Sequence, residues 1–150
     1  MFFSQASAYG LRAVTELARA WPNEWLLASD IATRLDIPLH YLAKVLQSLV
    51  KKGILDSQRG RQGGFKLAIA PDQLTAWDVV SELDDVRKIE ACVMGEEFCC
   101  DDSPCPLHLL WKGIRTHFIE SLETTTFSNL AEFQRNGNVQ NLLPKRPPDS

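Results

Sequence analysis

The chain has 150 residues and a formal net charge of −3, with 45% hydrophobic and 23% charged residues, which is typical of a single globular domain. This size excludes a large multidomain enzyme, and no apolar run reaches the roughly 18 residues that a membrane-spanning helix needs. Residues 1–70 carry a net charge of +4 and residues 71–150 a net charge of −7. The basic part favours a polyanionic partner. The N-terminus lacks a secretory pattern, so we expect a cytoplasmic protein with no membrane partner.

The first part of the chain predicts three helices. Apolar residues at helical spacing predict the first over residues 4–20, which either Ser4 or Ser7 can start. Ser29 is a suitable N-cap for a short second helix over 30–35. Asp36-Ile37-Pro38 predicts a tight turn into a third helix over 39–52, which Gly53 ends. A short helix, a turn and a longer helix are the elements of a helix-turn-helix unit.

A basic hairpin is predicted next. Residues 54–58 and 65–69 read as two extended runs, joined by the glycine-rich, cationic segment Arg59-Gly60-Arg61-Gln62-Gly63-Gly64. The order of elements predicts a mainly α, winged helix-turn-helix DNA-binding domain over residues 1–83.

Several residues of this domain are candidates for DNA contact. The third helix would enter the major groove with its N-terminal part, and an arginine at the hairpin tip suits a narrow minor groove. The candidates are Pro38, His40, Tyr41, Lys44, Gln47, Arg59 and Arg61. Tyr41 either contacts DNA or packs in the core, and a solvated basic turn is the alternative for the hairpin tip. Phosphate-loop, serine-hydrolase and zinc-protease motifs are missing from the sequence, so we expect no enzyme activity.

The second part of the chain holds a further helix and a cysteine segment. Thr75-Ala76-Trp77-Asp78 predicts a capping box and a helix to residue 83. Residues 84–106 read as an irregular loop, 107–134 as a dimerisation helix and 135–150 as a disordered tail. The apolar pattern of the long helix runs from Pro106 to about Thr124. The apolar stripe expected at the dimer interface consists of Leu107, Leu110, Trp111, Ile114, Phe118 and Leu122.

All four cysteines lie within fourteen residues. The pattern is Cys92, Cys99, Cys100 and Cys105, followed by His108. In a cytosolic chain such a cluster favours an iron–sulfur or zinc site over structural disulfides. Two Cys-x-x-Cys knuckles, the usual structural zinc pattern, are absent. A thiol–disulfide switch is the alternative, and His108 is either a ligand or a packed helix residue.

Five motifs together resemble the Rrf2 family of transcriptional regulators, which includes iron–sulfur, nitric-oxide and iron-responsive repressors. They are Ser7-Ala8-Tyr9-Gly10-Leu11-Arg12-Ala13, Ile37-Pro38-x-x-Tyr41-Leu42, Arg59-Gly60-x-x-Gly63-Gly64-Phe65-x-Leu67, the spaced cysteines, and Cys105-Pro106-Leu107-His108-x-x-Trp111. The resemblance covers roughly residues 1–130.

The resemblance implies a homodimer that binds a pseudo-palindromic DNA operator and holds a [2Fe-2S] or [4Fe-4S] cluster, which purification in air can remove. The matching ligands are Cys92, Cys105 and one of Cys99 or Cys100, with Cys99 in the better register. His108 matches a fourth ligand found in some members, whereas Ala8 stands where others have an acidic one. Cys100 departs from the family pattern and is itself a candidate fourth ligand. The alternative function is a clusterless regulator whose cysteine thiols sense oxidants directly or whose cysteine loop binds a small effector.

Overall fold

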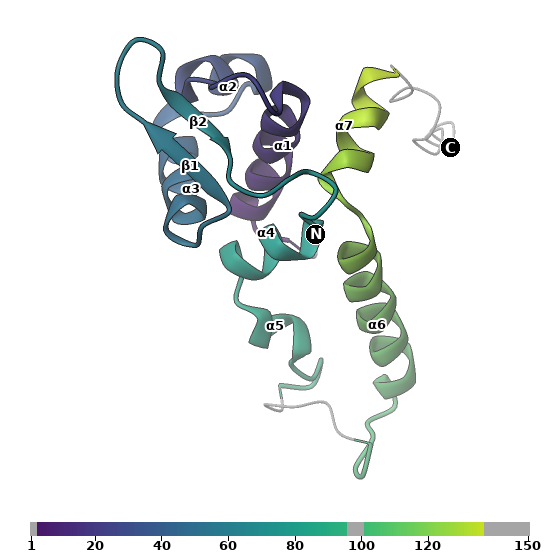
Figure 1. Ribbon diagram of the computed structural model, residues 1–150. Helices are drawn as coiled ribbons and strands as arrows, with labels where there is room; N and C mark the ends of the chain where they lie inside the picture. Colours follow the sequence, from purple (N-terminus) through teal and green to yellow (C-terminus); the bar gives the residue numbers. More distant parts are fainter. Residues whose placement is uncertain (1–2, 96–100, 137–150) are drawn as a thin grey trace, which may run out of the picture.

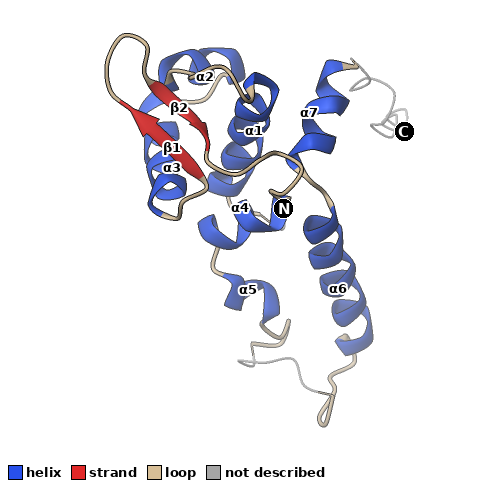
Figure 2. Cartoon of the chain, in the orientation of Figure 1, coloured by secondary structure: helices blue, strands red, loops and turns tan. Residues whose placement is uncertain are grey.

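The computed structural model describes residues 3–95 and 101–136. The fold is mainly helical with one two-stranded antiparallel sheet (Figures 1 and 2). In chain order the elements are α1 (Gln5–Ala20), α2 (Ala28–Leu35), α3 (Leu39–Lys51), β1 (Leu55–Gln58), β2 (Gly64–Leu67), α4 (Ala76–Leu83), α5 (Val86–Glu90), α6 (His108–Thr124) and α7 (Phe127–Arg135).

The first helix forms as its sequence predicts, whereas the second begins earlier. The Ser4 side chain caps α1 by accepting a hydrogen bond from the Ser7 backbone N–H. The expected N-cap at Ser29 is wrong, because α2 starts at Ala28 after an extended Leu27 that makes no side-chain cap. The neighbouring Leu26 explains the shift: its backbone exchanges two hydrogen bonds with Phe65 of β2, which holds the chain extended up to Leu27.

Helix α3 and the hairpin follow the predicted order. Leu42, Val45, Leu46 and Leu49 form the buried face of α3. The chain turns at Gly53, whose φ of +75° lies in the left-handed region that favours glycine. The strands then pair in register from Leu55 opposite Leu67 to Gln58 opposite Gly64. The tight turn between α2 and α3 is made by Asp36, which also has a positive φ, of 53°.

Gly64 controls how the hairpin joins the domain, and its replacement gives a first testable prediction. Its φ is +131°, and a Cβ there would overlap the backbone carbonyl of Leu26. We expect Gly64→Ala to lower the free energy of unfolding by roughly 2–5 kcal/mol, because backbone strain and a steric clash add together. Gly60→Ala is the matched control: Gly60 also has a positive φ, of +108°, but open space around it. Its cost should be about 1 kcal/mol. Urea unfolding followed by circular dichroism measures both, and equal losses would contradict the clash.

A short helix lies in the segment expected to be irregular. Thr75 and Asp78 form the predicted capping box at the start of α4. The expectation of an irregular segment over 84–106 is wrong at its beginning, because α5 forms a short turn of helix there. Asp85 caps α5 by accepting a hydrogen bond from the Arg87 N–H, and the neighbouring Arg87 guanidinium lowers the pKa of the Asp85 carboxyl.

The long helix ends at Thr124 as its apolar pattern predicts, so the segment 107–134, expected to be a dimerisation helix, is divided into α6 and α7. Thr125 and Thr126 leave the helical conformation, and Thr126 starts α7 with its own capping box to Asn129. The break is fixed by α4, since Ala76 donates a backbone hydrogen bond to Thr125 and Phe127 donates one to Leu74. Arg135, expected in the tail, belongs to α7, and residues 137–150 lie outside the described part.

The core is built around α1. Its Ala13, Val14 and Leu17 are buried against α3, the hairpin and α7, whose Phe127 is fully buried in the same cluster. A second, smaller cluster joins α4 to α6 through Val80 and Leu122. No described helix is long and apolar enough to cross a membrane. In Figure 1, α5 and the first half of α6 extend away from the rest of the domain.

Candidate nucleic-acid interface and cysteine site

Helix α3 presents a polar stripe on the side opposite its buried face. His40, Lys44 and Gln47 are exposed and spaced four and three residues apart, so they follow one side of the helix. Lys51 continues the stripe, and Pro38 is exposed at the N-cap. A helix with donors and acceptors along one exposed side is suited to lie in a major groove.

Tyr41 lies off this stripe. Its ring is half-buried and meets the Tyr9 ring of α1 edge-on, with centroids 5.5 Å apart and an interplanar angle of 87°. Of the two roles left open by the sequence, the geometry favours packing, because the contact fixes the start of α3 against α1.

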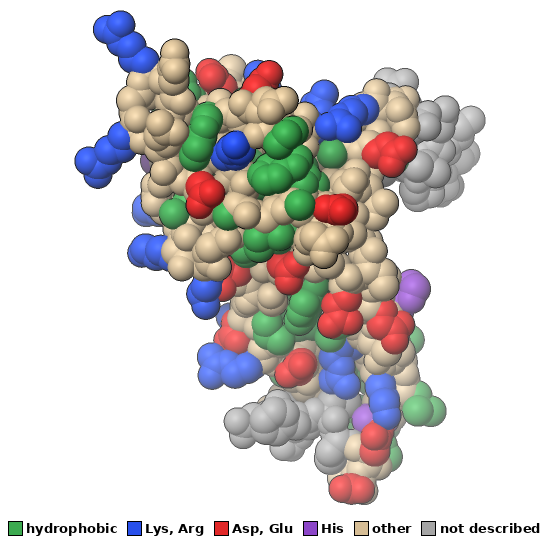
Figure 3. Space-filling model, in the orientation of Figure 1, with side chains coloured by type: hydrophobic (Ala, Val, Ile, Leu, Met, Phe, Trp, Pro, Cys, Tyr) green, Lys and Arg blue, Asp and Glu red, His purple; other side chains and the backbone are tan. Residues whose placement is uncertain are grey.

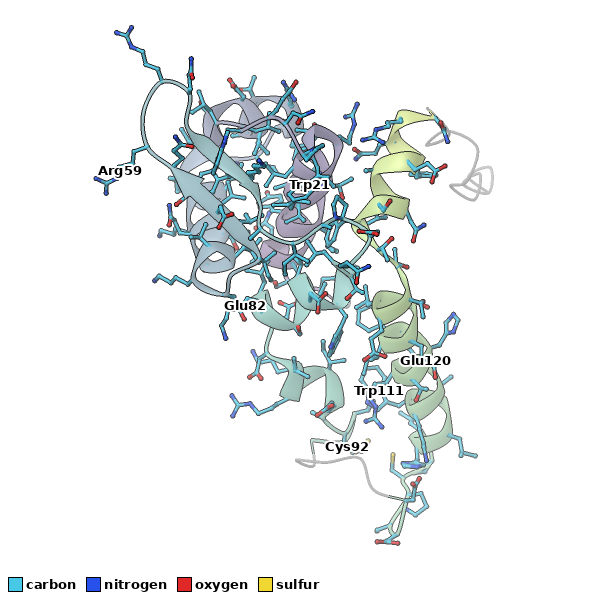
Figure 4. All side chains as sticks on the ribbon, in the orientation of Figure 1. Trp21, Arg59, Glu82, Cys92, Trp111 and Glu120 are labelled. Atoms are coloured by element: carbon cyan, nitrogen blue, oxygen red, sulfur yellow. The ribbon has the colours of Figure 1, made fainter. Side chains whose placement is uncertain are left out.

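The hairpin tip carries exposed arginines. Arg59 and Arg61 are both exposed, and Figure 4 shows Arg59 pointing away from the domain. Lysine and arginine side chains gather along the edge of the molecule that includes the hairpin tip (Figure 3). The hairpin is anchored at its other end, where Lys66 Nζ lies 5.8 Å from the centre of the Trp21 ring and 5.6 Å from that of Trp25.

Two of the four cysteines are described, and both are free, half-buried thiols. Cys105 lies just before α6. Cys92 follows a segment that α6 holds in place: Trp111 Nε1 donates a 2.8 Å hydrogen bond to the Ala91 carbonyl, and Arg115 donates one of 2.9 Å to the Glu90 carbonyl. Both cysteines therefore lie near the beginning of α6, where Figure 4 labels Cys92 and Trp111. Cys99 and Cys100 fall outside the described residues.

His108 is buried beside Cys105, with only 4% of its surface exposed. Its Nε2 lies 2.7 Å from Asp101 Oδ1, and Lys112 Nζ donates to both oxygens of the same carboxylate at 2.8 and 2.9 Å. Lys112, followed by His108, holds the pKa of Asp101 below its ordinary value. Asp101, Cys105 and His108 line a cavity of about 480 Å³.

The donor set of this region fits an iron–sulfur cluster or a zinc ion by its chemistry. Thiolates with an imidazole are the ligands of such groups, and a carboxylate bound to the other imidazole nitrogen is a common means of orienting a ligating histidine. With Asp101 on Nε2, ligation by His108 would use Nδ1 or require Asp101 to move. Within residues 3–95 and 101–136, no three His, Cys, Asp or Glu side chains lie close enough together to hold a metal ion. A complete site therefore requires ligands from outside these residues, and Cys99 and Cys100 are the candidates that the sequence predicts.

The expected dimer stripe divides into two parts. Leu122 is buried and Phe118 half-buried, both in contact with the cluster around α4 of the same chain. Leu110 is 62% exposed and Ile114 38%, and Leu107 is also exposed. Trp111 is half-buried and held by its bond to Ala91. The first half of α6 thus carries an exposed apolar face. Leu109, which is 84% exposed, lies beside it and was not part of the predicted stripe.

Sequence reasoning missed the contacts that shape the cysteine site. Asp101 is not among the residues that the sequence singles out, yet it binds both His108 and Lys112. Lys112 lies four residues after His108 on α6, a spacing that places both on one side of the helix and could have indicated a shared partner. The bonds from Trp111 and Arg115 end on backbone carbonyls, for which a sequence carries no signal.

Comparison with known proteins places these features in a family. The model of the Rrf2 family, described as iron-dependent transcriptional regulators, matches residues 3–132. The chain is 31% identical over 133 residues to the regulator CymR of Bacillus subtilis, covering 89% of this chain and 91% of CymR. It is 32% identical over 124 residues to the regulator NsrR of Bacillus licheniformis, covering 81% and 86%. The structure of CymR, the global cysteine regulator of B. subtilis, is similar with a TM-score of 0.74 at 29% identity, covering 87% of this chain and 96% of CymR.

Proposed function

The chain belongs to the Rrf2 family of transcriptional regulators, and we propose that it binds its operator as a homodimer and senses redox, nitric-oxide or iron status through an iron–sulfur cluster. The family and its relatives are DNA-binding regulators, not enzymes. The observation that carries the proposal is the pairing of two features: a polar α3 stripe with an arginine-tipped hairpin, and a cysteine segment held against α6.

The DNA-reading surface consists of α3 and the hairpin tip. His40, Lys44 and Gln47 would face base edges or phosphates in the major groove, while Arg59 and Arg61 would reach the adjacent minor groove or its phosphates. Pro38 begins the helix, and Tyr41 supports it from behind through Tyr9. A two-fold dimer presents this surface twice, which is why we expect a pseudo-palindromic operator.

The exposed apolar face of α6 supports dimerisation. Leu107, Leu110 and Ile114 leave apolar surface exposed, with Leu109 beside them, and contiguous exposed apolar surface marks interaction sites. Phe118 and Leu122 are used instead to attach α6 to α4. In this proposal Trp111 contributes at the edge of the face while holding the Cys92 segment.

The cysteine segment is the sensor in this proposal. Cys92, Cys105 and Cys99 are the assigned thiolate ligands, with Cys100 or His108 as the fourth; an iron–sulfur cluster bound there would supply one-electron chemistry and reactivity toward oxidants or nitric oxide. The segment is joined to α6 by Trp111 and Arg115, α6 packs on α4, and α4 packs on both α1 and α3. A rearrangement of the segment therefore has a continuous packed route to the DNA-reading helix.

A clusterless thiol sensor is the second candidate. The observation that favours it is the similarity to CymR, whose structure is described as that of a global cysteine regulator. In this case Cys92 and Cys105, both half-buried free thiols, would be oxidised directly by the oxidant that the protein senses.

Anaerobic purification of the whole chain tests the proposal. We expect brown protein with iron and acid-labile sulfide, a dimer mass in sedimentation, and selection of a pseudo-palindromic site from random duplex DNA. Removing the iron with a chelator should change the affinity for the selected site by about 5- to 150-fold, the usual range for coupled sites. Colourless protein with titratable thiols that still selects a DNA site would contradict the cluster and support the thiol sensor instead. No DNA selection in either state would overturn both candidates.

A further inference from the structure

Leu39 is an exposed leucine at the first position of α3. Its surface is 48% exposed, whereas Leu42, Leu46 and Leu49 of the same helix are fully buried, at 0%. It does not belong to the partly buried side chains that pack against the core. A single exposed leucine is ordinary on most protein surfaces, so its meaning depends on the groups that surround it.

The packing of α3 fixes the side of the helix on which Leu39 lies. Tyr41 meets the Tyr9 ring and Leu42 is buried in the core, so the helix cannot rotate about its axis without breaking these contacts. Successive residues of an α-helix are about 100° apart. Leu39 and Tyr41 therefore lie on either side of His40, with Tyr41 on the edge that meets α1 and Leu39 on the free edge.

Ala43 extends the free edge by one turn. It follows Leu39 by four residues, which places both on the same side of α3, and it is half-buried. Its side chain is a single methyl group, too short to cover Leu39. This apolar edge lies directly beside the exposed side chains of His40 and Gln47, which can hydrogen-bond to base edges.

The major groove of DNA offers one apolar group to such an edge. It is the 5-methyl group of thymine, which lies among the hydrogen-bonding groups of the bases. We propose that Leu39 contacts the 5-methyl group of a thymine in each operator half-site and thereby selects thymine at that position. The proposal names a specificity-determining residue of the DNA-reading surface and rests on the DNA-binding function proposed above.

The charges around Leu39 argue against a protein partner on this edge. Lys44 and Lys51 lie on the neighbouring polar stripe, and Arg59 and Arg61 lie at the hairpin tip. Among the described residues these side chains form no ion pair. A second copy of the chain would bring its own cations against them, whereas DNA phosphates neutralise them. The exposed apolar face of α6 is the surface that the proposed function assigns to the second copy.

Uracil substitution in the operator tests the methyl contact, because uracil differs from thymine only in lacking the 5-methyl group. The full chain is titrated with an operator selected from random duplexes, in which each thymine in turn is replaced by uracil in both half-sites. At one symmetric position we expect a loss of affinity of about fourfold per half-site, or about 15-fold in total, the effect of one methyl group each. With cytosine in place of that thymine, 5-methylation of the cytosine should strengthen binding by a similar factor.

Leu39→Ala is expected to lower the ratio of the affinities for the thymine and uracil operators from about 15 to about 1. Leu39→Met keeps a long apolar side chain and should retain most of this ratio. Leu27→Ala is the matched control, since Leu27 is a 42%-exposed leucine at the start of α2, and it should leave the ratio unchanged. No variant removes a charge, so the salt slope should stay that of the unmodified protein.

The ratio compares two operators on the same protein, so a loss of stability in a variant affects both affinities alike. Equal affinity for thymine and uracil at every position overturns the proposal and leaves operator binding intact. A uracil effect that persists in Leu39→Ala also overturns it, because another residue then contacts the methyl group. If the chain selects no operator at all, the proposed DNA-binding function is wrong and this inference is wrong with it.

Discussion

Replacing Arg59 and Arg61 together with alanine is expected to weaken operator binding by about 100-fold at physiological salt. Both side chains are exposed at the hairpin tip, and no ion pair to either is found in the described part of the chain. An arginine that contacts DNA contributes about 1–3 kcal/mol, so two give a factor of this order. The slope of log affinity against log salt should also fall by about two if both neutralise phosphates.

Gln62→Ala is the matched control for the hairpin tip. Gln62 lies between Arg61 and Gly63 in the same exposed turn but carries no charge. Its replacement should leave the salt slope unchanged. Fluorescence anisotropy with labelled operator at several salt concentrations measures all variants. An unchanged affinity in the double arginine variant would remove the hairpin from the DNA-reading surface and leave α3 as its only element.

Replacing Cys92 or Cys105 with serine is expected to abolish iron retention. The thiolate is the ligand, and a serine hydroxyl does not ionise near neutral pH. Because even substitutions outside the ligand set lower metal affinity by about 10- to 100-fold, the loss of a ligand should exceed 100-fold. Iron and acid-labile sulfide per subunit, measured on protein purified without air, are the readout, and Mössbauer spectra give the cluster type.

The same segment supplies a control variant and the variants that test the remaining candidate ligands. Ser103→Ala changes an exposed polar residue two positions before Cys105 and should retain full iron. Cys99→Ser should lose iron if the better register holds, and Cys100→Ser or His108→Ala identifies the fourth ligand. Full iron in both the Cys92 and Cys105 variants would contradict the site. Loss of iron with unchanged operator affinity would support the metal site but contradict its role as a sensor.

The local features of the fold were predictable because their signals are local. Ser4, the Thr75–Asp78 box and Gly53 act within a few residues of themselves, so the starts of α1 and α4 and the end of α3 follow from the sequence. The start of α2 was predicted at Ser29 because the long-range pairing of Leu26 with Phe65 has no local signal. The end of α6 at Thr124 was also predictable, because its apolar pattern stops there, and the β-branched run Thr124-Thr125-Thr126 agrees with it.

The sequence by itself determined the helix-turn-helix, the basic hairpin, the gathering of thiols and the family. Each of these features depends on the spacing and type of residues within one stretch of the chain. Only the tertiary structure decided that Tyr41 packs on Tyr9, that Leu122 faces α4 while Leu110 stays exposed, and that Trp111 holds the segment before Cys92. Helical spacing identifies an apolar face but not the element that covers it, because that choice depends on contacts between residues far apart in the chain.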